Sequence, residues 1–401
     1  MAMPGSDGVP LAEVIDALEA RYDPRTAEEW DAVGLTCGDP RAPVRRVHFA
    51  VDPVRETVDE AVAAGADLLV THHPLLLRGV HGVPADDPKG TLVHDLIRAG
   101  VALFTAHTNA DVARPGVSDA LAAALGVHDT TPLAPRPKPA LDKIIAFVPE
   151  AAADRVLDAM AAAGAGRIGD YSRAAFATTG TGTFRPEAGS TPHLGTVGAI
   201  ERVAEVRLET VLPRRLRSAV VAAMRGAHPY EEPAYDVLEL ADVPADIGLG
   251  RIGRLASTMT LDAFVQRVSG ALPATAWGVR AAGDPGRQVQ VVAVSGGAGE
   301  SLLGVVTGTD ADVCVTADLR HHPAAEHRLA GGPALVDVAH WATEWPWLAS
   351  AADLLRADLR DRIGTTVSTL LTDPWTIGAA ADCSNRSAAA LRLSDDPEET
   401  E

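Results

Sequence analysis

The stretch Ala66-Asp67-Leu68-Leu69-Val70-Thr71-His72-His73-Pro74 decides the fold class of this chain. Its apolar run predicts a buried strand, and two histidines follow directly where that strand ends. The pattern occurs a second time, because Ala311-Asp312-Val313-Cys314-Val315-Thr316 is followed, four residues later, by His321-His322-Pro323. Two related lobes, each containing such a strand, explain this repetition better than chance.

Predicted strands and helices alternate around both stretches. We interpret Asp52-Pro53 as the start of a helix that runs to residue 64, with Asp52 as its cap. The alternation resumes after Gly253. It is typical of an α/β fold whose parallel sheets are covered by helices on both faces. Strands are expected at residues 47–51, 68–70, 101–105, 289–294, 313–315 and 335–338, and further helices at 92–99 and 301–306.

The middle of the chain has a different pattern. Its predicted elements give the β-α-β-β-α-β order of a ferredoxin-like α+β domain, with strands at 144–148, 203–210 and 235–240 and helices at 151–163 and 214–225. Proline-rich and glycine-rich segments flank it, as linkers do. We therefore expect an N-terminal α/β lobe over residues 1–133, the inserted domain over 140–241, a C-terminal α/β lobe over 247–395 and an acidic tail over 396–401.

The composition excludes several classes of protein. The length of 401 residues suits about two or three domains. A balance of 35 Lys and Arg against 54 Asp and Glu gives a net charge of −19, which disfavours nucleic acid as a partner. Neither a secretory leader nor an apolar run long enough for a membrane span is evident, and three widely separated cysteines do not suggest a disulfide framework. We expect a cytoplasmic protein with no membrane partner.

Three groups of polar side chains follow predicted strands. The carboxyl ends of parallel strands meet at one edge of a sheet, where open α/β folds bind ligands, so the groups are expected to converge. Each group alone also has a structural explanation, such as a polar turn, a capping glutamate or a surface histidine. The groups are His72 with His73, His107 with Asp111, and His340 with Glu344.

The chemistry of these groups favours metal ions. Imidazoles and carboxylates without a thiolate suit two divalent ions of Zn, Mn, Fe or Co better than a structural cysteine-zinc site. Two such ions, about 3.5–4 Å apart, support hydrolytic chemistry. Because Pro346 disfavours helical geometry at Trp345, the helix that carries Glu344 is expected to begin near Thr343.

Three other polar or glycine-rich segments are ambiguous. Asp318 with His321 and His322 is consistent with residues that orient metal ligands, with an acid/base pair, or with a solvated loop. The run Gly296-Gly297-Ala298-Gly299 is interpreted as a tight turn rather than an anion-binding loop, because no Lys-Ser/Thr follows it. The segment 228–232 is interpreted as a structural turn.

Four motifs that span nearly the whole chain resemble one family, the Nif-three-like dinuclear-metal hexameric proteins, which are named GTP cyclohydrolase 1 type 2 homologues. Segments 166–171 and 227–232 are similar to the longer bacterial members. Ala32 and Ala317 stand where the family usually has Asn and Gly. The four motifs are Trp30-Asp31-Ala32-Val33-Gly34-Leu35, Thr71-His72-His73-Pro74, His107-Thr108-Asn109-Ala110-Asp111 and Asp337-Val338-Ala339-His340-Trp341-Ala342-Thr343-Glu344.

The resemblance implies a ligand set, an assembly and an activity. It implies a toroidal homohexamer and an insert similar to PII-like signal proteins. The implied function is a dinuclear metal-dependent hydrolase in which a metal-bound hydroxide attacks GTP, a related nucleotide or a phosphoester. His107 and His322 are the candidate catalytic residues that would relay protons. The alternatives are a non-enzymatic metal-binding or metal-delivery protein and a regulatory scaffold. The residues that match the family's metal ligands are His72, His73, Asp111, His340 and the bridging Glu344.

Overall fold

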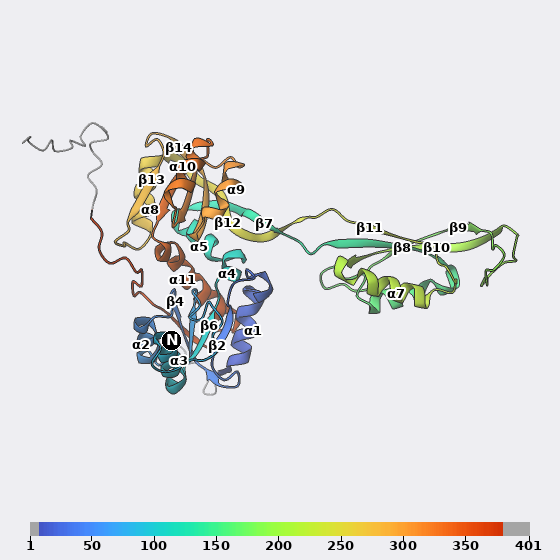
Figure 1. The fold of residues 1–401 in the computed structure, drawn as a ribbon, viewed down its shortest axis with the longest axis horizontal. Coiled ribbons are helices and arrows are strands. Elements are labelled where there is room, and N and C mark those ends of the chain that lie inside the picture. The colour runs from blue at the N-terminus through green and yellow to red at the C-terminus, as the bar shows by residue number, and fades with distance from the viewer. Residues whose placement is uncertain (1–7, 380–401) are drawn as a thin grey trace, which may run out of the picture. The chain divides into compact units, whose positions relative to one another are not determined.

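A computed structural model describes residues 8–379 of the chain. The expected acidic tail lies outside the described residues. The chain divides into two compact units, one formed by Met1–Pro135 with Asp246–Glu401 and the other by Arg136–Ala245 (Figure 1). None of the described helices is long and apolar enough to cross a membrane.

The first unit contains a five-stranded sheet in the order β17-β4-β5-β6-β2. Strands β4, β5 and β6 are parallel and are joined by α2 and α3, β17 is parallel to β4, and β2 is antiparallel to β6. All four residues of β5 are buried, as expected of a strand with both faces covered. The bounds are β2 Gly34–Cys37, β4 Arg46–Ala50, α2 Arg55–Ala63, β5 Leu68–Thr71, α3 Pro88–Ala99, β6 Ala102–Thr105 and β17 Gly364–Val367.

The same unit contains a six-stranded sheet in the order β13-β16-β15-β14-β12-β7. Here β14, β15 and β16 are parallel, whereas β12 and β13 run antiparallel to their neighbours. Helices α9 and α10 make the connections. The bounds are β7 Val127–Pro137, β12 Pro244–Thr260, β13 Val279–Ala282, β14 Gln288–Ala298, α9 Leu303–Thr307, β15 Val313–Ala317, α10 His321–Leu329 and β16 Ala334–Val338.

The two sheets repeat one local structure. The carboxylate of Asp67, just before β5, accepts the backbone N–H groups of Arg45 and Arg46. Asp312, just before β15, accepts those of Gln290 and Val291 in the same way. Each aspartate also accepts, through its backbone oxygen, the N–H that opens the next parallel strand. The repetition seen in the sequence is therefore also present in the hydrogen bonding of the two strands.

Helix α11 (His340–Asp358) lies between the two sheets (Figure 1). It packs on β4 and β17 of the first sheet and on β14 and β15 of the second. Its Trp347 and Leu348 belong to one continuous core that includes Phe49 and Val292. Because α11 starts directly after β16, this packing carries its first turn to the carboxyl edge of the first sheet. The other α-helices and strands described in the unit are β1 Val9–Pro10, α1 Leu11–Arg21, β3 Pro43–Val44, α4 Thr108–Val112, α5 Val117–Leu125 and α8 Leu261–Ala271.

The sheets exchange strands across the lobe boundaries expected from the sequence. Strand β7 begins within the expected N-terminal lobe but joins the second sheet. Strand β17 comes from the expected C-terminal lobe but pairs with β4 of the first sheet. The hydrophobic pattern of a strand shows which of its faces is buried. It does not show which of two sheets the strand joins, so the sequence could not reveal this exchange.

The second unit has the element order β-α-β-β-α-β and an antiparallel sheet in the order β11-β8-β10-β9. Its core lies between this sheet and the two helices and includes Val156, Met160 and Met224. Strand β9 was not located in the sequence, because nearly all its residues are exposed and two are glycines. The bounds are β8 Leu141–Pro149, α6 Ala153–Ala162, β9 Phe176–Phe184, β10 Glu201–Pro213, α7 Arg217–Ala227 and β11 Tyr235–Glu239.

Candidate metal centre

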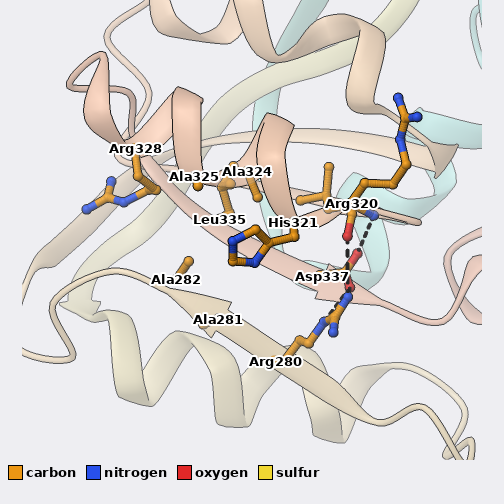
Figure 2. Close-up of a pocket in the computed structure, with 11 residues that line it drawn as sticks. Arg280, Ala281, Ala282, Arg320, His321, Ala324, Ala325, Arg328, Leu335 and Asp337 are labelled. Carbon is orange, nitrogen blue, oxygen red and sulfur yellow. Dashed lines mark hydrogen bonds and ion pairs between the residues drawn. The ribbon is translucent and has the colours of Figure 1, made fainter. Parts of the chain in front are cut away.

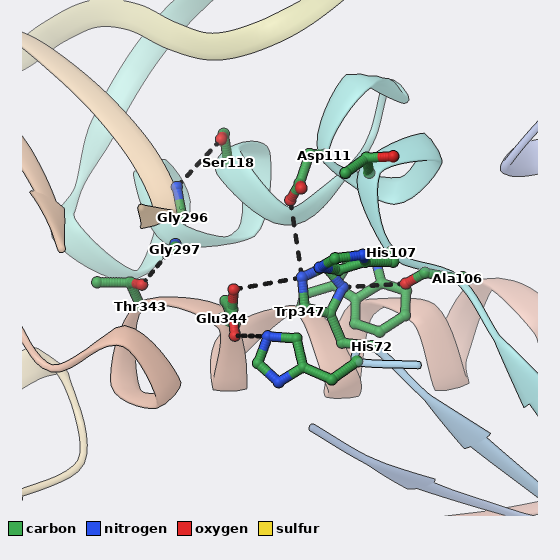
Figure 3. A network of polar contacts seen from close by, with 12 residues as sticks. His72, Ala106, His107, Asp111, Ser118, Gly296, Gly297, Thr343, Glu344 and Trp347 are labelled. Carbon is green, nitrogen blue, oxygen red and sulfur yellow. Dashed lines mark hydrogen bonds and ion pairs between the residues drawn. The ribbon is translucent and has the colours of Figure 1, made fainter. Parts of the chain in front are cut away.

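The three polar groups predicted from the sequence come together at the carboxyl ends of β5, β6 and β16 (Figure 3). Two sets of potential ligand atoms occur among the described residues, each within 4.8 Å of one another. His73 belongs to both sets, so they are neighbours. The sets are His72, His73 and His107, and His73, His340 and Glu344.

The carboxylate of Glu344 lies at the centre of this cluster. Its Oε1 is 2.8 Å from Nε2 of His340 and 3.3 Å from Nε2 of His72. Its Oε2 is 3.2 Å from Nε2 of His73. The two oxygens of one buried carboxylate thus face imidazoles from two different strand ends, which is the arrangement expected of a bridging ligand.

All four histidines present Nε2 to the cluster, because a neighbouring oxygen holds the Nδ1 of each ring. Carbonyl and ionised carboxylate oxygens can only accept, so each Nδ1 donates a proton and Nε2 keeps its lone pair in the neutral ring. The Nδ1 acceptors are Ala106 O for His72 at 2.9 Å, Asp52 for His73 at 2.7 Å, Asp31 for His107 at 2.8 Å and Asp318 for His340 at 2.7 Å.

Three buried polar atoms of the cluster have no hydrogen-bond partner among the described residues: Nε2 of His72, Oδ1 of Asp111 and Oε2 of Glu344. Nε2 of His72 and Oδ1 of Asp111 lie 3.8 Å apart. Buried polar atoms are nearly always paired, so three such atoms within one cluster indicate a missing partner. A divalent cation satisfies nitrogen and oxygen lone pairs together, and the residues therefore fit a metal ion.

Burial and the charges of the cluster shift the pKa of four of its side chains. Glu344 raises the pKa of His340 to about 11, against the opposing effect of burial and with help from Asp318. Burial lowers the pKa of His73, but Glu344 and Asp52 outweigh it and raise that pKa to about 10. Burial and the charge of Glu344 raise the pKa of Asp111 to about 7. Although burial opposes ionisation of Glu344, the surrounding imidazoles hold its pKa well below the usual range.

Gly297 forms a wall of the cluster that the sequence did not reveal. It has a φ of +62°, and a Cβ built on it would come within 2.6 Å of Oε1 of Glu344 and 3.2 Å of Nε2 of His340. Its N–H donates to the Thr343 hydroxyl on α11 (Figure 3). The glycine run that we interpreted as a tight turn is mostly the end of β14, and glycine at this position leaves room for the ligand atoms.

Two local predictions were wrong. Asp52 does not cap α2, which begins at Arg55 after Val54. Its carboxylate instead accepts from His73 and from the Thr372 hydroxyl. Helix α11 starts at His340 rather than near Thr343 and contains Pro346. Packing on both sheets outweighs the hydrogen bond lost at the proline, and the early start places His340 one turn before Glu344.

His107 and His322, the two candidate catalytic residues, lie in different surroundings. His107 is in the cluster, with ring centroids 5.1 Å from His72 and 5.4 Å from His73. His322 is an exposed residue at the start of α10 and stacks edge-on against His321, 5.2 Å away. His321 projects into a different pocket, beside Arg280 and Asp337 (Figure 2). Within the described residues, His322 makes no hydrogen bond or ion pair with the cluster.

Asp31 and Asp52 are the functional candidates that sequence reasoning missed. Asp31 lies in one of the recognised motifs, but its contact with His107 joins residues 76 positions apart. The only signal was its place in that motif. Asp318 was one of several open possibilities, and the structure shows it directed at His340.

Comparison with known proteins identifies the family. The chain matches the family described as Duf34/NIF3 (NGG1p interacting factor 3) over residues 9–374. It belongs to the Duf34/NIF3 family. The resemblance inferred from the four motifs is thereby confirmed.

Duf34/NIF3 relatives match along most of the chain. A protein of Mycobacterium tuberculosis (strain ATCC 25618 / H37Rv) named GTP cyclohydrolase 1 type 2 homolog is 54% identical over 370 residues, covering 92% of this chain and 97% of that protein. A Bacillus subtilis (strain 168) protein of the same name is 40% identical, covering 82% and 88%.

Solved structures show the same fold. A Bacillus cereus protein related to NIF3 has a TM-score of 0.69 at 36% identity, covering 93% of this chain and all of that one. Staphylococcus aureus protein SA1388 has a TM-score of 0.77 at 26% identity, covering 93% and 99%. The mixed α/β architecture is therefore shared with these two proteins.

Proposed function

We propose that this protein is a dinuclear metal-dependent hydrolase that acts on GTP, a related nucleotide or a phosphoester. The observation that carries the proposal is the convergence of three imidazole Nε2 atoms on Glu344, with the Nδ1 of each ring held by an oxygen. Two divalent ions held there would polarise a substrate oxygen and activate water near neutral pH. The name of the relatives, GTP cyclohydrolase 1 type 2 homolog, supports the choice of substrate class.

Two overlapping ligand sets favour two ions rather than one. We assign His72 and Asp111 to one ion and His73 and His340 to the other, with Glu344 shared by both. His72 and His73 are adjacent in the chain, and alternating side-chain directions at a strand end let them serve different ions. This assignment uses the three buried polar atoms of the cluster that have no hydrogen-bond partner among the described residues.

The remaining residues of the cluster hold and orient these ligands. Asp52 and Asp318 fix the ring orientation of His73 and His340 and increase the basicity of Nε2. His107, held by Asp31, directs its Nε2 at the same space. It is placed either to complete the coordination of the first ion or to pass a proton to a leaving group.

The test starts from the metal content of the purified protein, measured by elemental analysis. The protein loaded with the recovered metal is then assayed against GTP, other nucleotides and phosphoesters. We expect metal-dependent turnover, and His340→Ala should abolish it while the thermal midpoint of the metal-free protein stays close to wild type. A folded, fully loaded protein without turnover on the whole panel would instead support the metal-delivery alternative.

The assembly and the insert are further parts of the proposal. By resemblance to the family we propose a homohexamer and a PII-like character for residues 136–245. The antiparallel order β11-β8-β10-β9 with two helices supports the second point. Size-exclusion chromatography with light scattering on the full-length chain measures the first, and a monomer or dimer at micromolar concentration would refute it.

A further inference from the structure

A pocket of about 340 Å³ adjoins the metal cluster within the first unit. Two of the proposed metal ligands, His73 and His340, form one side of it. Trp277, Trp341 and Trp375 also line it, together with Asp373. We call this space the tryptophan pocket. A molecule bound in it would lie directly beside the residues that are proposed to carry the chemistry.

The aromatic walls suit a planar group. The rings of Trp277 and Trp375 have centroids 6.1 Å apart and an interplanar angle of 42°. Trp375 is 60% exposed, so its ring is accessible to a ligand in the pocket. The guanidinium of Arg280 lies 4.6 Å from the centroid of Trp277 and steadies that ring.

Two polar atoms of the pocket residues lack partners. Asp373 is only 6% exposed, and its Oδ2 has no hydrogen-bond partner within residues 8–379. Its Oδ1 accepts the backbone N–H of Trp375 at 3.4 Å. The indole Nε1 of Trp277 is likewise buried without an acceptor. An unpaired acceptor and an unpaired donor beside aromatic walls match the edge of a nitrogen heterocycle.

The charge of the pocket restricts the ligand further. Three carboxylates, those of Asp52, Asp318 and Asp373, line it, and none of the described lining residues is Lys or Arg. His73 and His340 offset Asp52 and Asp318, but no described side chain offsets Asp373. A phosphate group placed beside Asp373 would be repelled, whereas a neutral or cationic ring would not.

We propose that the tryptophan pocket binds the planar nitrogen heterocycle of the substrate, with Asp373 accepting a ring or amino N–H, and that phosphate groups stay outside it. This inference rests on the proposed function, because it assigns the pocket to the substrate of the same metal centre. Purine and pyrimidine bases are ligands of this chemical class.

The test is calorimetric titration of guanosine, adenosine and cytidine into the full-length protein, both metal-free and metal-loaded. We expect at least one nucleoside to bind. Asp373→Asn and Trp375→Leu should each weaken that binding by about tenfold or more. Tyr171→Leu, which removes a 78% exposed aromatic ring from the second unit, is the matched control and should leave it unchanged. Binding of inorganic tripolyphosphate should be insensitive to Trp375→Leu.

The outcomes separate this inference from the proposed function. If nucleosides bind in a way that depends on Asp373 and Trp375, but no substrate is turned over, the proposed role of the tryptophan pocket is supported and the hydrolase function is refuted. If turnover is unchanged in both variants, the proposed role of the tryptophan pocket is refuted and the hydrolase function still stands. Failure of every nucleoside to bind, with or without metal, also overturns the pocket. Thermal midpoints close to wild type establish that the variants are folded.

Discussion

The carboxylate of Glu344 lies 2.8 Å from Nε2 of His340, the residue one helical turn before it on α11. Glu344 is almost completely buried, and imidazoles face both of its oxygens. A buried carboxylate is costly unless its charge is matched. The charge of Glu344 is therefore matched either by protonated histidines or by metal ions. The first two predictions follow from these two alternatives.

Replacing Glu344 with Gln should empty the metal centre. Glutamine keeps the shape but removes the charge that both proposed ions share, so we expect metal content per subunit to fall close to zero by elemental analysis. The thermal midpoint should also become insensitive to EDTA. Glu326→Gln, on the exposed face of α10, is the control. Full metal content in Glu344→Gln would exclude the bridging role.

Metal binding should release protons and strengthen as the pH rises. The pKa values of about 10 for His73 and about 11 for His340 mean that both rings are protonated in the metal-free protein at pH 7. A metal ion must displace these protons, so acid competes with it and affinity falls as the pH falls. Titration calorimetry in buffers of different ionisation enthalpy should detect roughly two protons released from these histidines per loaded subunit, with a further fraction of a proton from Asp111, whose pKa is about 7. A pH-independent affinity between pH 6 and 8 would contradict this.

Gly297→Ala should impair metal loading through contact with the ligands. The added methyl group would meet Glu344 and His340, and the residue would also keep a strained φ of +62°. Gly100→Ala isolates the strain, because Gly100 has a φ of +72° with no atom near its missing Cβ. We expect both variants to lose about 1 kcal/mol of stability, and only Gly297→Ala to lose metal. Equal metal content in the two variants would show that the glycine serves the backbone alone.

Arg251→Met should strongly destabilise the first unit. This guanidinium is fully buried, binds both oxygens of Asp119 at 2.7–2.8 Å and donates to the backbone oxygens of Gly248, Gly250 and Ala113. Breaking such a pair leaves its partners unsatisfied, at a cost of about 3–5 kcal/mol. Arg254→Met removes an exposed ion pair with Asp310 and should cost less than about 1 kcal/mol. Urea unfolding of both variants gives the comparison.

The sequence predicted the convergence of the cluster because strand ends of parallel sheets share an edge. His72, His340 and Glu344 each follow a short apolar run, and that local pattern was enough. Asp52 was misassigned for the opposite reason, since its partner His73 is 21 residues away and a capping interpretation was locally adequate. No local pattern distinguishes an aspartate that caps a helix from one that orients a ligand.

Long-range packing accounts for the other differences. The start of α11 at His340, despite Pro346, depends on two sheets that hold the helix from opposite sides. Gly297 leaves space for the ligand atoms because it lies on β14, at the point where that strand meets α11. Helix α11 in turn is held there by packing on both sheets. Trp277 and Asp373 are 96 positions apart in the chain, so their common pocket could only be recognised in three dimensions.

The exchange of β17 into the first sheet has a consequence for biosynthesis. Strand β4 leaves the ribosome more than three hundred residues before its edge partner β17 does. Until then β4 presents an unpaired edge, the feature by which nascent chains pair wrongly with each other. Thr372, which also binds the carboxylate that orients His73, is synthesised just after β17. The N-terminal part of the chain therefore needs the C-terminal part twice. Strand β17 completes its sheet, and Thr372 helps to hold the carboxylate that orients His73.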